Sequence, residues 1–194
     1  MDYRPFPRAR TFLHSRRRLL IVAAAAVALA AGTWIASRQI ADVNLHFSVV
    51  EENVLYRSGQ PSASQLASLV RKYNIRTTVN LRGPETAAKD KRMADEIGFA
   101  KANGLRYVNI PYSDANAQAQ IAEFLVVVAD PANRPALVHC AEGIERSGVM
   151  VAAFRMKMQG WSLAQALAEM EQHGYRREKS PEMREAVEEF AKEL

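Results

Sequence analysis

The segment 139–148, which reads HCAEGIERSG, constrains the fold of this chain more than any other segment. It holds the only cysteine, between a predicted buried strand at 135–138 and an apolar, helix-forming run at 149–158. The first amides of a helix lack intrahelical partners and the helix dipole adds partial positive charge, so such a turn favours an anion. The sequence therefore places the Cys140 thiol and the Arg146 cation together at an anion-binding turn.

The net charge of +5 would suit a nucleic-acid-binding protein, but the basic residues are unevenly distributed. Residues 1–38 hold seven of the 26 Lys and Arg and one of the 21 acidic residues, which leaves 19 basic and 20 acidic residues elsewhere. No stripe of Lys and Arg with interleaved aromatic residues is present in that near-neutral remainder. The charge pattern therefore argues against a nucleic-acid partner.

The N-terminal region predicts a transmembrane helix. Residues 19–36 are uncharged and largely Ala, Leu, Val and Ile, and a helix of this length spans about 27 Å, near the minimum for crossing a bilayer. Three arginines at 16–18 precede the run, and only Arg38 follows it closely. By the positive-inside rule, the N-terminus stays in the cytoplasm and the rest of the chain is extracytoplasmic, which in a bacterium means periplasmic. A buried core helix is the alternative, but it would not require the arginines.

Two routes to the far side of the membrane remain open. The run may be retained as a single-pass signal anchor of the inner membrane, which we favour, or cleaved near the small residues at 28–30. Residues 15–17 also resemble a twin-arginine signal. A chain with one cysteine cannot form an internal disulfide in an oxidising compartment.

These features divide the chain into a basic cytoplasmic tail at 1–18, the anchor at 19–36, a juxtamembrane linker at 37–50 and one catalytic domain at 51–194. The domain alternates strands and helices, which predicts an α/β fold with a small, mainly parallel central sheet and helices on both faces. Strands are expected at 53–56, 77–81, 106–110 and 135–138. Helices are expected from a cap at Ser62 or Ser64 to 73, at 85–101, between the loop at 111–116 and the break at 130–133, from 147, near 163–170 and from 181.

The pattern His139-Cys140-x5-Arg146-Ser147 between a strand and a helix resembles the signature of cysteine-dependent protein tyrosine and dual-specificity phosphatases. VLYRSGQP at 54–61, VNLR at 79–82 and the strand at 135–138 resemble the compact, atypical dual-specificity branch found in bacteria, fungi and plants. The resemblance covers about residues 51–179. It implies hydrolysis of phosphomonoesters through a phosphocysteine, with no metal and no cofactor.

The chemistry of a thiol nucleophile leads to the same roles. A free thiol with a pKa near ~8.5 is mostly protonated at neutral pH, and helix N-termini and cationic neighbours lower thiol pKa values to about 3.5–7.5. We expect the Arg146 guanidinium to bind two phosphoryl oxygens, the Ser147 hydroxyl to bind the departing Cys140 thiolate, and His139 to orient the loop. The backbone amides that are expected to cradle the phosphoryl group belong to Ala141, Glu142, Gly143, Ile144, Glu145 and Arg146.

The leaving oxygen needs a proton from a general acid. Asp114 is our candidate because it follows the third predicted strand, at the sheet edge where Cys140 falls. The resemblance implies an acid on a comparable loop, although the sequence around Asp114 lacks the aromatic-proline-aspartate motif of better-known members. Glu142 and Glu145, inside the signature loop, are the alternatives.

Several alternatives to this interpretation stay open. Arg57 and Arg82 could line the pocket, but pairing with acidic neighbours at the surface is favoured. A rhodanese-type sulfur carrier and a non-catalytic phosphate-binding module would also use an amide-lined loop. The negative charges of Glu142 and Glu145 disfavour polyanions, which favours phosphoproteins or small phosphomonoesters over lipid or inositol phosphates.

Overall fold

The computed structural model describes residues 20–29, 45–83 and 89–194. The chain divides into two compact units, Met1–Val43 and Asn44–Leu194. In the first unit residues 20–29 are helical, and the rest of the predicted tail and anchor lies outside the described residues. Within the three described segments, no helix is both long enough and apolar enough to cross a membrane.

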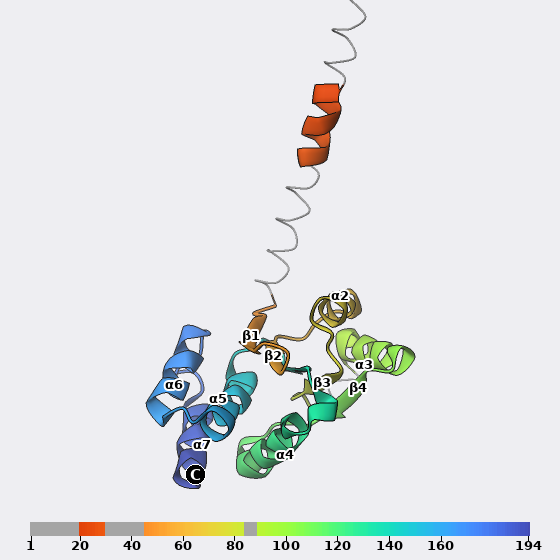
Figure 1. Ribbon diagram of the computed structural model, residues 1–194. Helices are drawn as coiled ribbons and strands as arrows, with labels where there is room; N and C mark the ends of the chain where they lie inside the picture. Colours follow the sequence, from red (N-terminus) through yellow and green to blue (C-terminus); the bar gives the residue numbers. More distant parts are fainter. Residues whose placement is uncertain (1–19, 30–44, 84–88) are drawn as a thin grey trace, which may run out of the picture. The chain divides into compact units, whose positions relative to one another are not determined.

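The second unit is built on a five-stranded sheet with the order β1-β2-β5-β3-β4 (Figure 1). β2, β5, β3 and β4 run parallel to one another, and β1 is antiparallel to β2. The predicted mixed α/β fold with a mainly parallel sheet is therefore confirmed. The strands are β1 (Ser48–Glu51), β2 (Leu55–Ser58), β3 (Thr77–Asn80), β4 (Arg106–Asn109) and β5 (Ala136–His139).

The edge strand β1 was not predicted. Ser48 pairs with Arg57 and Val49 with Tyr56, so the sheet begins inside the segment expected to be a linker up to residue 50. The pattern gave no sign of this strand because it is short and lies at the sheet edge, where Val49 keeps 44% of its surface exposed. Arg57, one residue beyond the strand predicted at 53–56, lies within β2.

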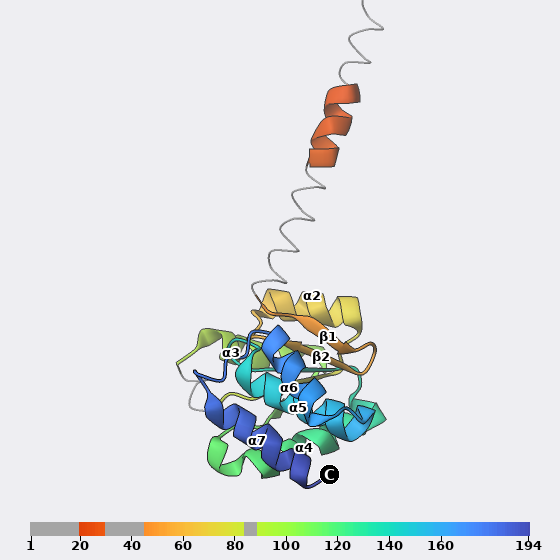
Figure 2. The same cartoon turned by 90° about the vertical axis from the view of Figure 1, so that its left-hand side faces the viewer.

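Helices cover both faces of the sheet, as Figures 1 and 2 show. α2 (Ala63–Tyr73) and α3 (Lys91–Asn103) contribute Leu66, Leu69 and Ala100 to the smaller apolar cluster on one face. The larger cluster on the other face is built by four further helices. These are α4 (Ala117–Ala129), α5 (Glu145–Gln159), α6 (Leu163–Gln172) and α7 (Pro181–Lys192).

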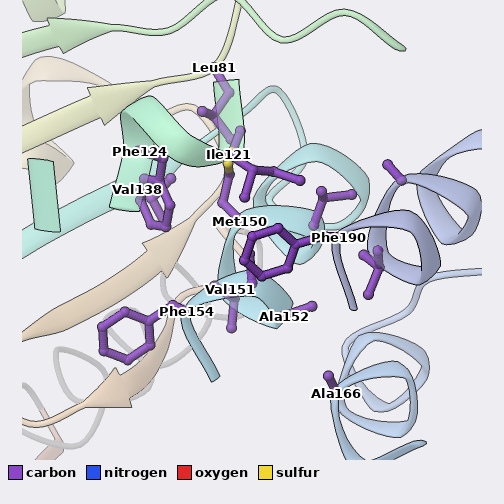
Figure 3. Packing of buried hydrophobic residues seen from close by; sticks show 14 of the residues in the cluster. Leu81, Ile121, Phe124, Val138, Met150, Val151, Ala152, Phe154, Ala166 and Phe190 are labelled. Carbon is purple, nitrogen blue, oxygen red and sulfur yellow. The ribbon is translucent and has the colours of Figure 1, made fainter. Parts of the chain in front are cut away.

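The central helix of the larger layer is α5, which follows the signature loop. Its residues from Ser147 to Phe154 are all buried, as expected for a helix enclosed on every side by protein. Met150 of α5 and Phe190 of α7 both belong to this cluster, which Figure 3 shows from close by. The loop before α5 is therefore anchored to the helix of the domain that has the most buried residues.

The observed helix starts agree only in part with those predicted. Ser62 and Ser162 each form a capping box with the glutamine three residues later, which fixes the starts of α2 and α6. α5 begins at Glu145, two residues before the predicted start. α3 begins at Lys91 behind an Asp90 cap, whereas residues 84–88 at its predicted start lie outside the described residues.

Candidate active site

The signature loop connects β5 to α5 and holds Cys140 at its first position. Cys140 is 1% exposed, and its Sγ accepts a hydrogen bond from the Gly143 amide at 3.1 Å. The buried hydroxyl of Ser147, in the first turn of α5, lies 3.7 Å from the same sulfur. The structure thus brings Cys140 and Ser147 together at the N-terminus of a helix, where negative charge on the sulfur is favoured.

Gly143 makes the tight course of the loop possible. It has a positive φ of 80°, and a Cβ at this position would come within 2.5 Å of the Gly59 nitrogen and the Ser58 carbonyl carbon. From the same β2–α2 segment, the Gln60 amide donates to the Ala141 carbonyl at 3.0 Å. The segment 58–60 therefore lies directly behind the loop and holds its backbone.

The remaining loop positions differ in exposure. Ala141 and Glu142 are exposed, whereas Ile144, Glu145 and Arg146 are partly buried. The Glu142 carbonyl accepts a 2.7 Å hydrogen bond from Nδ1 of His46, a contact that the sequence did not indicate. Glu145 opens α5, where an acidic side chain is favourable to the helix dipole.

The Arg146 guanidinium is fixed near the end of β3. Its Nη1 donates to the carbonyl oxygen of Leu81 at 3.4 Å, and the side chain remains partly exposed. This contact restrains the arginine while leaving most of its donors for a ligand. The arrangement suits the predicted role in binding an oxyanion.

Arg57 contradicts the prediction that it pairs at the surface. Its side chain is 1% exposed, and its Nη2 donates to the carbonyl oxygens of Gly143 at 2.8 Å and Ile144 at 3.2 Å. The sequence could not reveal this because the partners are backbone carbonyls more than 80 residues away, which have no sequence signature. Arg57 supports the loop from behind.

Arg82 does pair with an acidic neighbour, although it is only slightly exposed. Its Nη1 lies 2.7 Å from an Asp90 carboxylate oxygen and donates to Gln60 Oε1 at 3.1 Å. The Arg82 hydrogen bond, with a further one from the Arg92 amide, lowers the pKa of Asp90 to about 2. Arg82 thus connects the start of α3 to the segment behind the loop.

His139 points away from Cys140, to the other face of the sheet, because alternate strand residues face opposite sides. Its Nε2 lies 2.7 Å from Oε1 of Glu96, a fully buried residue of α3. Sequence reasoning missed Glu96. The available signal was its position in phase with buried Met93 and Ala100, at the helical spacing i, i+3 and i+7.

The Glu96 carboxylate also accepts hydrogen bonds from Gln60 Nε2 at 2.8 Å, Thr78 Oγ1 at 2.8 Å and Asn80 Nδ2 at 3.1 Å. Burial raises the pKa of Glu96, but the charge and hydrogen bond of His139 and the other donors outweigh it, so the net pKa is lowered. An ionised carboxylate only accepts hydrogen bonds, so His139 donates from Nε2. The network fixes the histidine next to the nucleophile.

Asp114 is not brought into contact with the loop. It is exposed and begins the short 3-10 helix η2 (Asp114–Asn116) after β4. Among the hydrogen bonds and ion pairs of the described residues, none joins Asp114 to Cys140 or Arg146. Burial raises the pKa of Tyr112, and the nearby charge of Asp114 adds to that effect. The role of Asp114 as general acid remains a prediction.

No metal site emerges from the part of the chain that the structure describes. Residues 20–29, 45–83 and 89–194 contain no cluster of three or more His, Cys, Asp or Glu side chains suited to a metal ion.

Residues 30–191 match the family described as DSP-PTPase phosphatase fused to NAD+ kinase. Inositol diphosphatase DSP1 of Oryza sativa subsp. japonica is 34% identical over 131 residues, 61% of this chain and 52% of that protein. Dual specificity protein phosphatase TpbA of Pseudomonas aeruginosa (strain UCBPP-PA14) is 31% identical over 123 residues, 62% of this chain and 51% of that protein. The chain thus spans about half the length of these two relatives.

The fold is also found among solved structures. The core catalytic domain of the PP-IP phosphatase SIW14 from S. cerevisiae superposes with a TM-score of 0.61 at 22% identity, over 75% of this chain and 85% of that one. This likeness concerns the fold. The family match over residues 30–191 establishes that the chain belongs to the DSP-PTPase phosphatase family, as the signature segment predicted.

Proposed function

We propose that this protein is a phosphomonoester hydrolase with Cys140 as its nucleophile. The observation that carries the proposal is the 3.1 Å hydrogen bond from the Gly143 amide to Cys140 Sγ in the turn before α5. A backbone that already donates to the sulfur favours the thiolate, which is the reactive form. Family membership supports the same reaction.

The reaction proceeds in two displacements. The Cys140 thiolate attacks phosphorus while the bond to the ester oxygen breaks, and that oxygen takes a proton from the general acid, which we assign to Asp114. The resulting Asp114 carboxylate then takes a proton from a water molecule, and the oxygen of that water attacks the phosphorus of the phosphocysteine. The sulfur–phosphorus bond breaks, and the Ser147 hydroxyl stabilises the released thiolate.

Phosphotyrosine, phosphoserine or phosphothreonine proteins and small phosphomonoesters are the proposed substrates. A Cys-to-Ser variant of P. aeruginosa TpbA was crystallised in complex with pTyr. In this chain, exposed Glu142 adds negative charge at the loop, which disfavours substrates with several phosphate groups. An inositol phosphate or a membrane lipid phosphate is the second candidate. It is favoured by the 34% identity to a relative named as an inositol diphosphatase.

Hydrolysis of p-nitrophenyl phosphate by the purified full chain, in the presence of a metal chelator, tests the proposal. The expected result is turnover that is lost in Cys140→Ser. Activity that survives this substitution, or turnover only with added metal, would contradict the mechanism. Absence of turnover together with transfer of sulfur from thiosulfate to cyanide would identify a rhodanese-type carrier instead.

Residues 19–36 are proposed to anchor the protein in the inner membrane. Residues 1–18 would then lie in the cytoplasm and the catalytic domain on the periplasmic side. The uncharged run and the preceding arginines support this orientation. Expression of the full chain in a bacterial host, followed by protease treatment of spheroplasts, tests it. Recovery with the membranes and digestion of the catalytic domain are expected, whereas full protection would contradict the orientation.

A further inference from the structure

We infer that Arg57 is a second arginine of the active site, a positioning residue that fixes the loop carbonyls from behind and stabilises the Cys140 thiolate. The inference rests on the proposed function, because it concerns the same loop. Arg57 does not face the phosphoryl group as Arg146 does. It acts on the backbone that binds that group.

The geometry follows from the peptide plane. In a trans peptide, the carbonyl oxygen of one residue and the amide hydrogen of the next point in opposite directions. Arg57 holds the carbonyl oxygens of Gly143 and Ile144, so the amide hydrogens of Ile144 and Glu145 point away from it. These are two of the six amides that are expected to bind phosphoryl oxygens, and Arg57 preorganises both.

The charge of Arg57 has few partners. Its Nε and Nη1 are buried and have no hydrogen-bond partner among the described residues. A buried cation is costly unless negative groups compensate it. Burial lowers the pKa of Arg57, while the charges of Glu169 and Cys140 raise it; an arginine nevertheless stays charged at neutral pH.

The ionisable groups near Arg57 indicate which of them can compensate its positive charge. They are Glu169 of α6, Arg155 of α5, His173 after α6, and Cys140. Glu169 is already engaged by Arg155, with nitrogen–oxygen distances of 2.6 to 3.1 Å. Cys140 is therefore the remaining group near Arg57 that could carry a compensating negative charge, and both the buried cation and the helix N-terminus favour such a charge on its sulfur.

Alkylation by iodoacetamide tests the inference without phosphoryl chemistry. Cys140 is the only cysteine, so the mass increase of the intact full chain across a pH series reports the ionisation of this thiol alone. The variants are Arg57→Met, which removes the charge and both hydrogen bonds, and Arg57→Lys, which keeps the charge. Arg134→Met is the matched control, because Arg134 also donates to two backbone carbonyls, those of Val128 and Ala129, away from the loop.

In Arg57→Met we expect the pH midpoint of alkylation to rise by about one unit or more. We also expect kcat/KM on p-nitrophenyl phosphate to fall about tenfold or more, as for lost hydrogen bonds from a charged donor. Arg57→Lys restores the midpoint but not the full kcat, since one ammonium cannot reproduce the paired geometry. Arg134→Met keeps the wild-type midpoint and rate.

A folded Arg57→Met protein, checked by near-UV circular dichroism, with an unchanged alkylation midpoint would overturn the inference. If Arg57→Met does not fold, Arg57→Lys decides: wild-type kcat overturns the positioning role, and lowered kcat with an unchanged midpoint supports it. Wild-type protein without phosphatase activity but with the expected midpoint shift in the variants would reject the proposed function and retain the electrostatic role of Arg57.

Discussion

Glu96 Oε1 lies 2.7 Å from His139 Nε2, and neither side chain has any exposed surface. The pair joins α3, on one face of the sheet, to the residue that directly precedes the nucleophile. Because Cys140 belongs to the larger cluster on the opposite face, the strand end carries the nucleophile on one side and its anchor on the other. The loop is thus fixed from both layers of the fold.

Removal of the Glu96 charge is predicted to destabilise the domain strongly. Glu96→Gln keeps the shape of the side chain but replaces the buried carboxylate that accepts hydrogen bonds from four side chains, and each buried group left unsatisfied typically costs about 1–3 kcal/mol. Urea unfolding followed by circular dichroism measures the change. Asp95→Asn is the matched control, since the neighbouring Asp95 makes an exposed i,i+4 pair with Lys91, worth only about 0.3–0.5 kcal/mol. Equal effects of the two substitutions would refute the importance of burial.

The same carboxylate predicts a pH dependence of stability. Folding lowers the pKa of Glu96 below its ordinary value of 4.5. Between the lowered pKa and 4.5, the folded state therefore binds fewer protons than the unfolded state. The resulting stabilisation is fully present above 4.5 and is lost as the pH falls below it. The difference in free energy of unfolding between wild type and Glu96→Gln should therefore shrink on acidification. A difference that stays constant through this range would contradict the assignment.

Gly143→Ala is predicted to lower both stability and activity. The new Cβ would overlap backbone atoms of Gly59 and Ser58, and the φ of 80° is unfavourable for alanine. Gly98→Ala offers a control of the opposite sign. Gly98 lies within α3, and a Cβ added there would have no atom within 4 Å, so alanine should stabilise the protein by up to about 1 kcal/mol. Thermal unfolding and p-nitrophenyl phosphate turnover distinguish the two; a fully active Gly143→Ala would be inconsistent with the observed backbone packing.

Much of the fold could be predicted because its signals are local. The strand before Cys140, the cap expected at Ser62 or Ser64 and the apolar phase of the helices each lie within a short window of sequence. β1 was not predicted, because an edge strand of four residues is too short to show a clear hydrophobic pattern. The burial of Arg57 and Glu96 was not predicted, because it depends on partners from other elements. Charged residues are rarely buried unless such partners exist. The sequence signal for the nucleophile is local, whereas the residues that support its loop are identified only by contacts between distant segments.

Ser147→Ala is predicted to slow the second displacement more than the first. The hydroxyl lies 3.7 Å from Cys140 Sγ, where it can stabilise the thiolate that leaves the phosphocysteine. Rapid mixing with p-nitrophenyl phosphate should show a burst of p-nitrophenol followed by a slower steady state, and mass spectrometry should detect phosphorylated protein. A slowed burst with no accumulated intermediate would place Ser147 in the first step instead.

Asp114→Asn tests the proposed general acid through the leaving group. p-Nitrophenolate leaves without a proton, whereas an alkyl alkoxide needs one, so general-acid catalysis worth about 10²–10⁴-fold should be lost mainly on alkyl phosphates. Single-turnover release of the alcohol isolates the first displacement from the hydrolysis step. Glu142→Gln and Glu145→Gln are the matched controls, because these carboxylates belong to the loop itself. If one of them, rather than Asp114→Asn, shows the leaving-group dependence, the proton comes from within the loop, and the exposed position of Asp114 in η2 reflects a structural role.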